Sequence, residues 1–259
     1  MMLTRNEIKE IRSLGRKRKR DEMGLFLAEG PKVVGDLLGK FPCRLLVYTD
    51  AFSEEFGSSL SSAYAEDARQ VTQKELERAS LLQSPQGVLA LFEKPVAEKV
   101  DATLPSRELC IALDGVQDPG NVGTIVRIAD WFGIRHVFCS PDTADVFAPK
   151  VVQATMGAIG RVKAHYLPLP QFLQEVGKRA LVMGTFLDGA NIYSTQLPAT
   201  GVLLMGSEGH GISEACARMV SQRLLIPAAP HEADGSESLN VAVATAICVS
   251  ELRRNLLRG

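Results

Sequence analysis

Two polar segments near the carboxyl end of the chain follow or precede apolar runs and carry side chains suited to ligand binding. The segment GSEGHG (206–211) follows the apolar run 201–205 and holds one acid, Glu208. Ser238 and Asn240 place a hydroxyl and an amide at the start of a long apolar stretch. Loops at the carboxyl ends of neighbouring strands are where an open α/β sheet binds its ligand. We therefore expect these segments to hold a small cofactor.

A second polar pair lies about eighty residues earlier, in DPGNVGTIVRIAD (118–130). Asn121 follows a Pro-Gly turn and is suited to cap a helix. Arg127 lies six residues further, about 9 Å along that helix and off its apolar face. Each has a structural alternative, because Asn121 could serve only as a cap and Arg127 could be a surface cation paired with Asp130.

Alternating apolar strands and helices must position these residues. At 259 residues the chain is long enough for two domains. The pattern of residues 1–95 predicts a small α/β domain. Residues 96–107 have mixed charge and no periodic spacing of apolar residues, which predicts a linker. Residues 108–259 continue the strand–helix alternation, which predicts an α/β domain with a mainly parallel sheet.

The amino end of the chain is strongly basic, although the formal net charge of the whole chain is −1. Residues 1–20 hold eight basic and two acidic residues. The densest part is the run Arg16, Lys17, Arg18, Lys19 and Arg20. The run could be a solvated charged turn, but we favour a loop that contacts the phosphates of an anionic partner, because a basic helix precedes it.

Several classes of function lack their sequence signals. No GxGxxG follows a strand and no P-loop is present, so a nicotinamide-dependent oxidoreductase is poorly supported. The four histidines have no metal-ligand spacing, and we expect no metal. Five cysteines without a CxxC favour a reduced, cytoplasmic compartment. No apolar run reaches the ~20 residues of a membrane span, and the amino end does not read as a signal peptide.

Three blocks in this order resemble the signature motifs of one enzyme family. They are DPGNVGTIVRIAD (118–130), LLMGSEGHGI (203–212) and IPAAP…SESLNVAVATAICVSELRR (226–254). Together they resemble the SpoU (TrmH-like) family of RNA ribose 2′-O-methyltransferases, in the SPOUT superfamily, over about residues 108–257. Residues 1–95 resemble the substrate-binding domain of L30e/L7Ae type that accompanies this family.

The resemblance implies a trefoil knot in the second domain, S-adenosylmethionine as methyl donor, and a homodimer. It implies RNA as substrate, with ribosomal RNA favoured over transfer RNA because an added RNA-docking domain suits a structured ribosomal target. A non-catalytic RNA-binding protein on the same fold is the alternative, and the intact polar positions of the three motifs argue against it.

The resemblance also assigns residues. The motif positions expected to act in catalysis are Asn121, Arg127, Glu208, Ser238 and Asn240. The positions expected to contact the cofactor are Thr185, Leu187, Gly206, Glu208, Gly209, Ile226 and Leu239. We expect Arg127 to clamp the substrate phosphate and stabilise the developing alkoxide, because a guanidinium is normally charged; a role as base stays open.

The loop before Ser238 departs from the family pattern. It is longer and more acidic than the family's usual short turn, with residues 230–237 reading PHEADGSE. It could be a mobile lid over the cofactor or a neutral surface insertion, and we prefer the insertion.

Overall fold

The computed structural model describes residues 3–56, 65–229 and 238–257. Contacts divide the chain into two compact units. The first comprises Met1–Ala97 and Asp145–Arg161, and the second comprises Glu98–Ala144 and Val162–Gly259. Residues Asp145–Arg161, which we call the return segment, therefore pack with the amino-terminal unit. The alternation of strands and helices in the sequence does not predict this packing. The assignment of 1–95 and 108–259 as functional domains stays a prediction.

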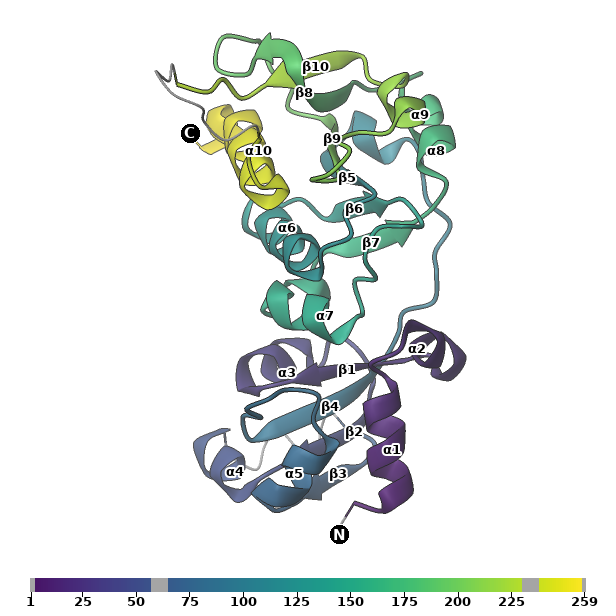
Figure 1. Cartoon of the computed structure of the whole chain (residues 1–259), viewed down its shortest axis with the longest axis vertical. Coiled ribbons are helices and arrows are strands. Elements are labelled where there is room, and N and C mark those ends of the chain that lie inside the picture. Colours follow the sequence, from purple (N-terminus) through teal and green to yellow (C-terminus); the bar gives the residue numbers. More distant parts are fainter. Residues whose placement is uncertain (1–2, 57–64, 230–237, 258–259) are drawn as a thin grey trace. The chain divides into compact units, whose positions relative to one another are not determined.

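The first unit is built on a four-stranded mixed sheet in the order β1-β4-β2-β3 (Figure 1). Its strands are β1 (Leu25–Glu29), β2 (Cys43–Tyr48), β3 (Ala68–Gln70) and β4 (Val88–Glu93). Its helices are α1 (Arg5–Ser13), α2 (Lys17–Met23), α3 (Pro31–Leu37), α4 (Asp50–Phe56), α5 (Gln73–Ala79) and α7 (Pro149–Thr155), with a 3₁₀ turn, η3 (Ala158–Gly160). Strand β4 runs antiparallel to both β1 and β2, so alternation of strands and helices does not make this sheet parallel.

Two apolar layers cover this sheet. Ile11 of α1 and Leu76 of α5 are buried in one cluster with Leu27 and Leu89 of the strands. Phe26 of β1 lies in the other layer, where its ring stacks on Phe92 and meets the ring of Phe147, just before α7. The return segment therefore contributes to the core of the first unit.

The basic run 16–20 is not a loop, as the sequence suggested: Arg16 is the N-cap of helix α2, and residues 17–20 form its first turn. Thr4 caps the preceding helix α1 through a complete capping box with Glu7. Within α2, Arg20 is 2% exposed and its guanidinium contacts Asp145 Oδ2 at 2.6 Å. It also donates to the carbonyl of Leu14 at 2.8 Å. Arg20 is thus buried inside the unit and bonded to Asp145 and Leu14, so it is not available to contact RNA phosphates.

The second unit is a six-stranded sheet in the order β10-β8-β9-β5-β6-β7, and every neighbouring pair is parallel. The strands are β5 (Leu109–Asp114), β6 (His136–Cys139), β7 (Lys163–Tyr166), β8 (Val182–Asn191), β9 (Gly201–Gly206) and β10 (Gln222–Leu225). The helices are α6 (Pro119–Trp131), α8 (Leu169–Val176), α9 (Glu214–Ala217) and α10 (Val241–Leu257), with a 3₁₀ turn, η2 (Leu104–Ser106). The predicted parallel α/β sheet is confirmed.

Helices enclose this sheet and leave its carboxyl edge to loops. Buried Leu169 and Leu173 of α8 pack on strand residues that include Cys110 and Phe138. Helix α10 lies beside α6 (Figure 1). All six residues of β5 and of β9 are buried, which is why these central strands read as unbroken apolar runs. The loops that follow β5 and β9 therefore meet at one edge.

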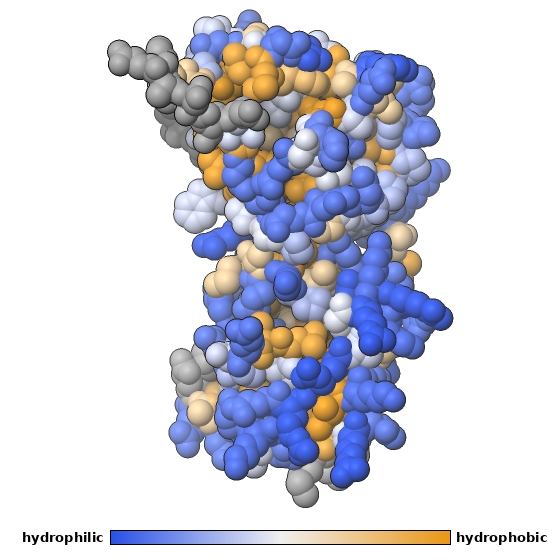
Figure 2. All heavy atoms as spheres, viewed as in Figure 1, coloured by the Kyte–Doolittle hydropathy of each residue, from blue (hydrophilic) through white to orange (hydrophobic). Residues whose placement is uncertain are grey.

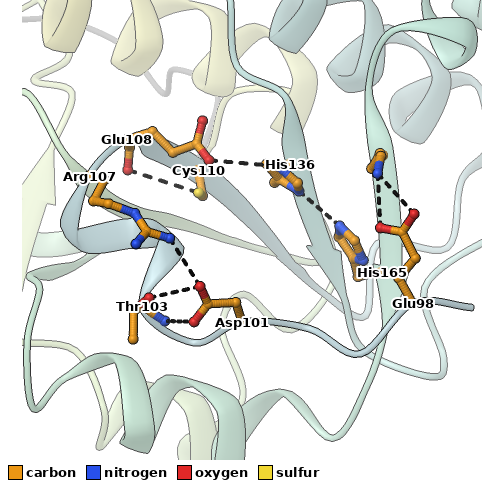
Figure 3. A network of polar contacts seen from close by, with 9 residues as sticks. Glu98, Asp101, Thr103, Arg107, Glu108, Cys110, His136 and His165 are labelled. Carbon is orange, nitrogen blue, oxygen red and sulfur yellow. Dashed lines mark hydrogen bonds and ion pairs between the residues drawn. The ribbon is translucent and has the colours of Figure 1, made fainter.

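A network of polar side chains lies at the opposite edge of the sheet (Figure 3). His136 begins β6, and its Nδ1 lies 3.0 Å from Nε2 of His165 on β7. The two rings stack with centroids 5.2 Å apart. His136 also lies 3.6 Å from Glu108, and Lys163 pairs with Glu98. Burial and the neighbouring charges of His136 and Lys163 lower the pKa of His165 to about 4.

This histidine pair predicts acid lability of the second unit. A depressed His pKa means that the unfolded chain binds more protons than the folded one between pH 6.5 and about 4. The stabilisation by neutral His165 is therefore complete above pH 6.5 and is lost as pH falls towards 4. The loss is about 2 kcal/mol once the full value of ~3.4 kcal/mol is reduced for solvent screening of the partly exposed ring. Urea unfolding across this range should reveal the slope, and His165→Phe should flatten it. An equally steep slope in the variant would exclude the pair as its source.

Candidate active site

Three polar side chains from distant parts of the chain meet at the carboxyl edge of the parallel sheet. Asn121 lies in the first turn of α6 after β5, Glu208 follows β9, and Asn240 precedes α10. Asn121 Nδ2 donates to Glu208 Oε1 at 2.7 Å, and Asn240 Nδ2 donates to the same oxygen at 2.7 Å. Asn240 Nδ2 also reaches Asn121 Oδ1 at 2.9 Å. The structure therefore joins one residue from each of the three sequence blocks; we call these three residues the amide–acid cluster.

Helix capping leaves the Asn121 side chain available for this cluster. The N-cap of α6 is Asp118, whose Oδ1 accepts a hydrogen bond from the Asn121 backbone N–H at 2.8 Å. Pro119 occupies the first helical turn, where its missing N–H costs nothing. The interpretation of Asn121 as the cap was therefore wrong, since the cap lies three residues earlier and Asn121 is already helical.

Asn240 has two tasks at once. Its Oδ1 accepts from the backbone N–H groups of Ala242 at 3.0 Å and Val243 at 3.2 Å, which caps α10. With the carbonyl oxygen used in this way, the amide NH₂ points at Glu208. Both amide donors bind one carboxylate oxygen, and such charge-assisted hydrogen bonds are the stronger ones. Glu208 is thus an anchor that orients two amides.

A pocket of about 460 Å³ adjoins the cluster. It is lined by the loop after β5, by Asp142 and by the loop after β9, and both Asn121 and Glu208 are among the lining residues. Asp114 at the end of β5 is buried, and its Oδ2 accepts from Ser213 N–H at 2.7 Å. This hydrogen bond ties the loop after β9 to the neighbouring strand and so sets the position of Glu208.

Gly206 is required by a close approach of the same loop. A Cβ at this position would lie 2.1 Å from the carbonyl carbon of Gly211 and 2.2 Å from the nitrogen of Ile212. Any other residue would force the loop away from the strand. Gly206 thus has a packing reason to be glycine, whereas nothing within 4 Å restricts a Cβ at Gly209. Contact of either with a cofactor stays a prediction.

Strand β8 departs from regular pairing with β10 part-way along its length. Gly184 pairs with Arg223 of β10, but the next residue of β10, Leu224, pairs with Ala190. Residues 185–189 therefore form an excursion from the ladder. Arg223 holds it in place, because its guanidinium pairs with Asp188 and lies 3.5 Å over the ring centre of Phe186.

The other residues assigned to the cofactor lie around the same sheet edge. Thr185 and Leu187 belong to the excursion of β8, Ile226 follows β10, and Leu239 precedes α10. Leu187 is 80% exposed and Leu239 is 49% exposed. Residues 226–229 have no regular secondary structure, so their peptide groups are not used in a strand ladder. Apolar side chains beside free peptide groups suit the flat base of an adenosyl group.

Two of the expected catalytic residues lie outside the amide–acid cluster. Arg127 is exposed on α6, six residues beyond Asn121, and it forms no ion pair with the described part of the chain. The alternative pairing with Asp130 is therefore not observed. Ser238 is exposed and precedes the cluster residue Asn240 by two positions. The acidic segment 230–237, interpreted as an insertion, lies outside the described residues.

The described ranges contain neither a candidate metal site nor a candidate membrane span. Within residues 3–56, 65–229 and 238–257, no group of three or more His, Cys, Asp or Glu side chains could hold a metal ion. No helix in these ranges is long and apolar enough to span a membrane. The five cysteines are free and buried, and burial raises the pKa of the Cys110 and Cys248 thiols to about 12.

Comparison with known proteins agrees with this geometry. A model of the SpoU rRNA methylase family matches residues 108–250, which contain the whole cluster. A model of the MRM3-like substrate-binding domain matches residues 5–90. A 23S rRNA (guanosine(2553)-2′-O)-methyltransferase from Bacillus subtilis is 28% identical over 95% of this chain and 96% of its own length.

Solved structures resemble the chain over nearly its full length. A TrmH-family protein from Porphyromonas gingivalis is 42% identical, with a TM-score of 0.87 over 98% of this chain and 100% of its own. An rRNA methyltransferase from Sinorhizobium meliloti, solved with bound AdoMet, is 31% identical, with a TM-score of 0.84 over 99% of this chain and 97% of its own.

Proposed function

This chain belongs to the SpoU rRNA methylase family, and from that premise we propose that it transfers a methyl group from S-adenosylmethionine to a ribose 2′-hydroxyl of ribosomal RNA. The observation that carries the proposal is the amide–acid cluster of Asn121, Glu208 and Asn240, which unites the three motif blocks at the carboxyl edge of the sheet. The names of relatives that act on 23S rRNA support ribosomal RNA over transfer RNA.

The residues of the site have two roles in the reaction: some position the reacting groups, and one stabilises the charge that develops. When bound, S-adenosylmethionine supplies an electrophilic methyl group on a sulfonium sulfur. Attack by a ribose hydroxyl requires that the oxygen lie in line with the methyl–sulfur bond, which is largely a matter of orientation. Asn121 and Asn240, held by Glu208, orient donors and acceptors at this edge. The Arg127 guanidinium has five N–H donors with which to hold the adjacent phosphate and the developing alkoxide.

Glu208 is better suited to anchor this cluster than to remove the hydroxyl proton. Its Oε1 already accepts two amide hydrogen bonds. These two bonds use both lone pairs of that oxygen and fix the carboxylate between the two asparagines rather than at a substrate hydroxyl. The proton acceptor therefore lies elsewhere, in a substrate group, in solvent or at Arg127.

We also propose a cytoplasmic homodimer with a trefoil knot in the second unit. Support for the dimer comes from α10, which packs on α6 and still exposes 49% of Val243. The knot is proposed from the match of residues 108–250 to the SpoU family. Light scattering would measure the mass of the particle, and a monomer at working concentration would contradict the dimer.

The proposed function is tested by methyl transfer from labelled S-adenosylmethionine to total cellular RNA, followed by mapping of ribose methylation. We expect label in ribosomal RNA at a 2′-oxygen. Label in transfer RNA alone would overturn the substrate, and label in a base would overturn the reaction. Binding of both S-adenosylmethionine and RNA without transfer would favour the non-catalytic alternative.

The basic residues 16–19, at the start of α2, are proposed to contact RNA phosphates. Arg16 and Lys17 are exposed, and Arg18 and Lys19 pair with Glu22 on the surface, where such pairs contribute about 0–1 kcal/mol. Phosphates can therefore replace Glu22 at little cost. Figure 2 shows hydrophilic side chains gathered over α1 and α2.

Neutralising these four residues is expected to weaken RNA binding and its dependence on salt. Each phosphate contact that is lost lowers the slope of log affinity against log salt by about 0.7–0.9. Glutamine at positions 16–19 should therefore flatten the slope in a filter-binding titration. Lys32→Gln, a charge change on α3 of the same unit, is the matched control. An unchanged slope would mean that α2 does not touch phosphates.

A further inference from the structure

Arg223 on the edge strand β10 contacts both residues that flank Leu187 in the excursion of β8. Its Nε and Nη2 donate to Oδ1 of Asp188 at 3.2 and 2.5 Å. Its guanidinium carbon lies 3.5 Å from the centre of the Phe186 ring. Because Phe186 and Asp188 are the sequence neighbours of Leu187, one arginine fixes the excursion on both sides of that leucine.

Close packing holds the two ends of the excursion, and side chains hold its middle. A Cβ at Gly184 would lie 2.7 Å from the Phe186 ring, and one at Gly189 would lie 2.5 Å from the carbonyl carbon of Leu224. Both glycines therefore allow a close approach where the excursion leaves and rejoins the sheet. Between them, residues 185–188 have no ladder partner within the described strands. The middle of the excursion thus depends on contacts such as those of Arg223.

The excursion adjoins the loop that carries Glu208. Thr185 Oγ1 donates to Sδ of Met205 at 3.9 Å, and Met205 directly precedes the GSEGHG loop (206–211). Arg223 itself lies three residues before Ile226. It therefore links two of the segments that are expected to contact S-adenosylmethionine.

The burial of these residues favours a local role for Arg223. Leu187 is 80% exposed, so no core surrounds it, and its position depends on the residues beside it. The side chains of Arg223 and Asp188 are 42% and 74% exposed, and an ion pair this exposed adds little to global stability. The contact is therefore expected to order the excursion rather than to hold the fold.

We propose that Arg223 is a positioning residue that orders the excursion 185–189 before S-adenosylmethionine binds. The inference rests on the proposed function and adds a residue outside the three motif blocks. A loop that is already ordered does not pay its ordering entropy on binding, so the affinity for the cofactor rises. Arg223 acts through Phe186 and Asp188, so its loss raises KM for S-adenosylmethionine and leaves kcat at saturating cofactor unchanged.

Calorimetric titration of the full-length protein with S-adenosylmethionine, without RNA, measures the affinity. Arg223→Ala is expected to weaken binding about 5- to 10-fold, because it removes one cation–π contact and one surface ion pair from the excursion. Arg223→Lys keeps the charge but not the planar group, and should restore part of the affinity. Arg218→Ala removes an exposed ion pair with Glu214 at α9 of the same unit, and should leave the affinity unchanged.

Amide hydrogen exchange of residues 185–189 measures the order of the excursion directly. Without cofactor, these amides should exchange faster in Arg223→Ala than in the unaltered protein, because local opening exposes them more often. With saturating S-adenosylmethionine, the two proteins should exchange alike. The free energy of unfolding should be nearly the same in both.

Three results would overturn the positioning role of Arg223. The first is equal affinity of Arg223→Ala and the unaltered protein for S-adenosylmethionine. The second is weaker binding with unchanged exchange at 185–189, which would mean that Arg223 contacts the cofactor itself. The third is a large loss in the free energy of unfolding, which would make Arg223 a residue of the fold. Cofactor binding without methyl transfer by the unaltered protein would overturn the proposed function alone.

Discussion

Replacing Arg127 by alanine is expected to lower kcat for methyl transfer about 10²–10³-fold, with S-adenosylmethionine binding unchanged. A ribose hydroxyl that loses its proton while attacking develops negative charge, and a fixed guanidinium stabilises that charge more than it stabilises the neutral hydroxyl. Arg127 is exposed on α6 without an ion-pair partner among the described residues, so its donors are available to substrate. Single-turnover kinetics with the mapped RNA measures the effect.

Arg127→Lys is the matched variant for this prediction. Lysine keeps the positive charge but lacks the planar set of N–H donors of a guanidinium. It therefore cannot replace arginine in a bidentate contact with a phosphate. We expect it to recover only part of the rate. If Arg127→Ala transfers methyl at the normal rate and still binds RNA, then Arg127 is a surface cation.

Arg20→Met is expected to destabilise the first unit by about 3–5 kcal/mol, because it leaves Asp145 without its buried partner. Arg20 is 2% and Asp145 9% exposed, and Asp145 Oδ2 accepts two hydrogen bonds from the guanidinium, at 2.6 and 3.1 Å. Asp145 Oδ1 also accepts from the backbone N–H of Phe147 at 3.0 Å. This pair ties α2 to the return segment of the chain. Chemical unfolding of the full chain measures the loss.

Two further variants test whether the loss of stability comes from the Arg20–Asp145 ion pair. Arg18→Met, at an exposed position with a surface partner, should change the free energy of unfolding by about 0–1 kcal/mol. Arg20→Met combined with Asp145→Leu removes both charges and should recover most of the loss, since an apolar pair can replace a buried ion pair. A loss below about 1 kcal/mol for Arg20→Met alone would show that the pair does not anchor α2.

Much of the fold follows from local patterns in the sequence. The unbroken apolar runs of β5 and β9 are typical of strands buried on both faces, and both are central strands. Thr4 with Glu7 is a capping box, and it begins α1. These signals depend on residues that are neighbours in sequence, so the sequence shows them directly. The three motif blocks likewise predict that Asn121, Glu208 and Asn240 belong to one site, and the structure brings these three side chains together.

Tertiary structure decided which partner each of these side chains meets. The run 16–20 reads as uniformly basic, yet helical geometry turns Arg20 inward towards Asp145, 125 residues away. Asn121 has the chemistry of a cap, but Asp118 takes that position, and the Asn121 amide is left for Glu208. The excursion of β8 at 185–189 becomes visible only against its neighbour β10.

The sequence by itself therefore determined the α/β class, the family and the polar residues of the site, because periodicity and motif spacing are local properties. It did not determine the return of Asp145–Arg161 to the first unit or the burial of Arg20. These depend on which surfaces remain uncovered once all elements are packed. Burial is a property of the assembled chain, and no window of sequence contains the atoms that cover or expose a given side chain.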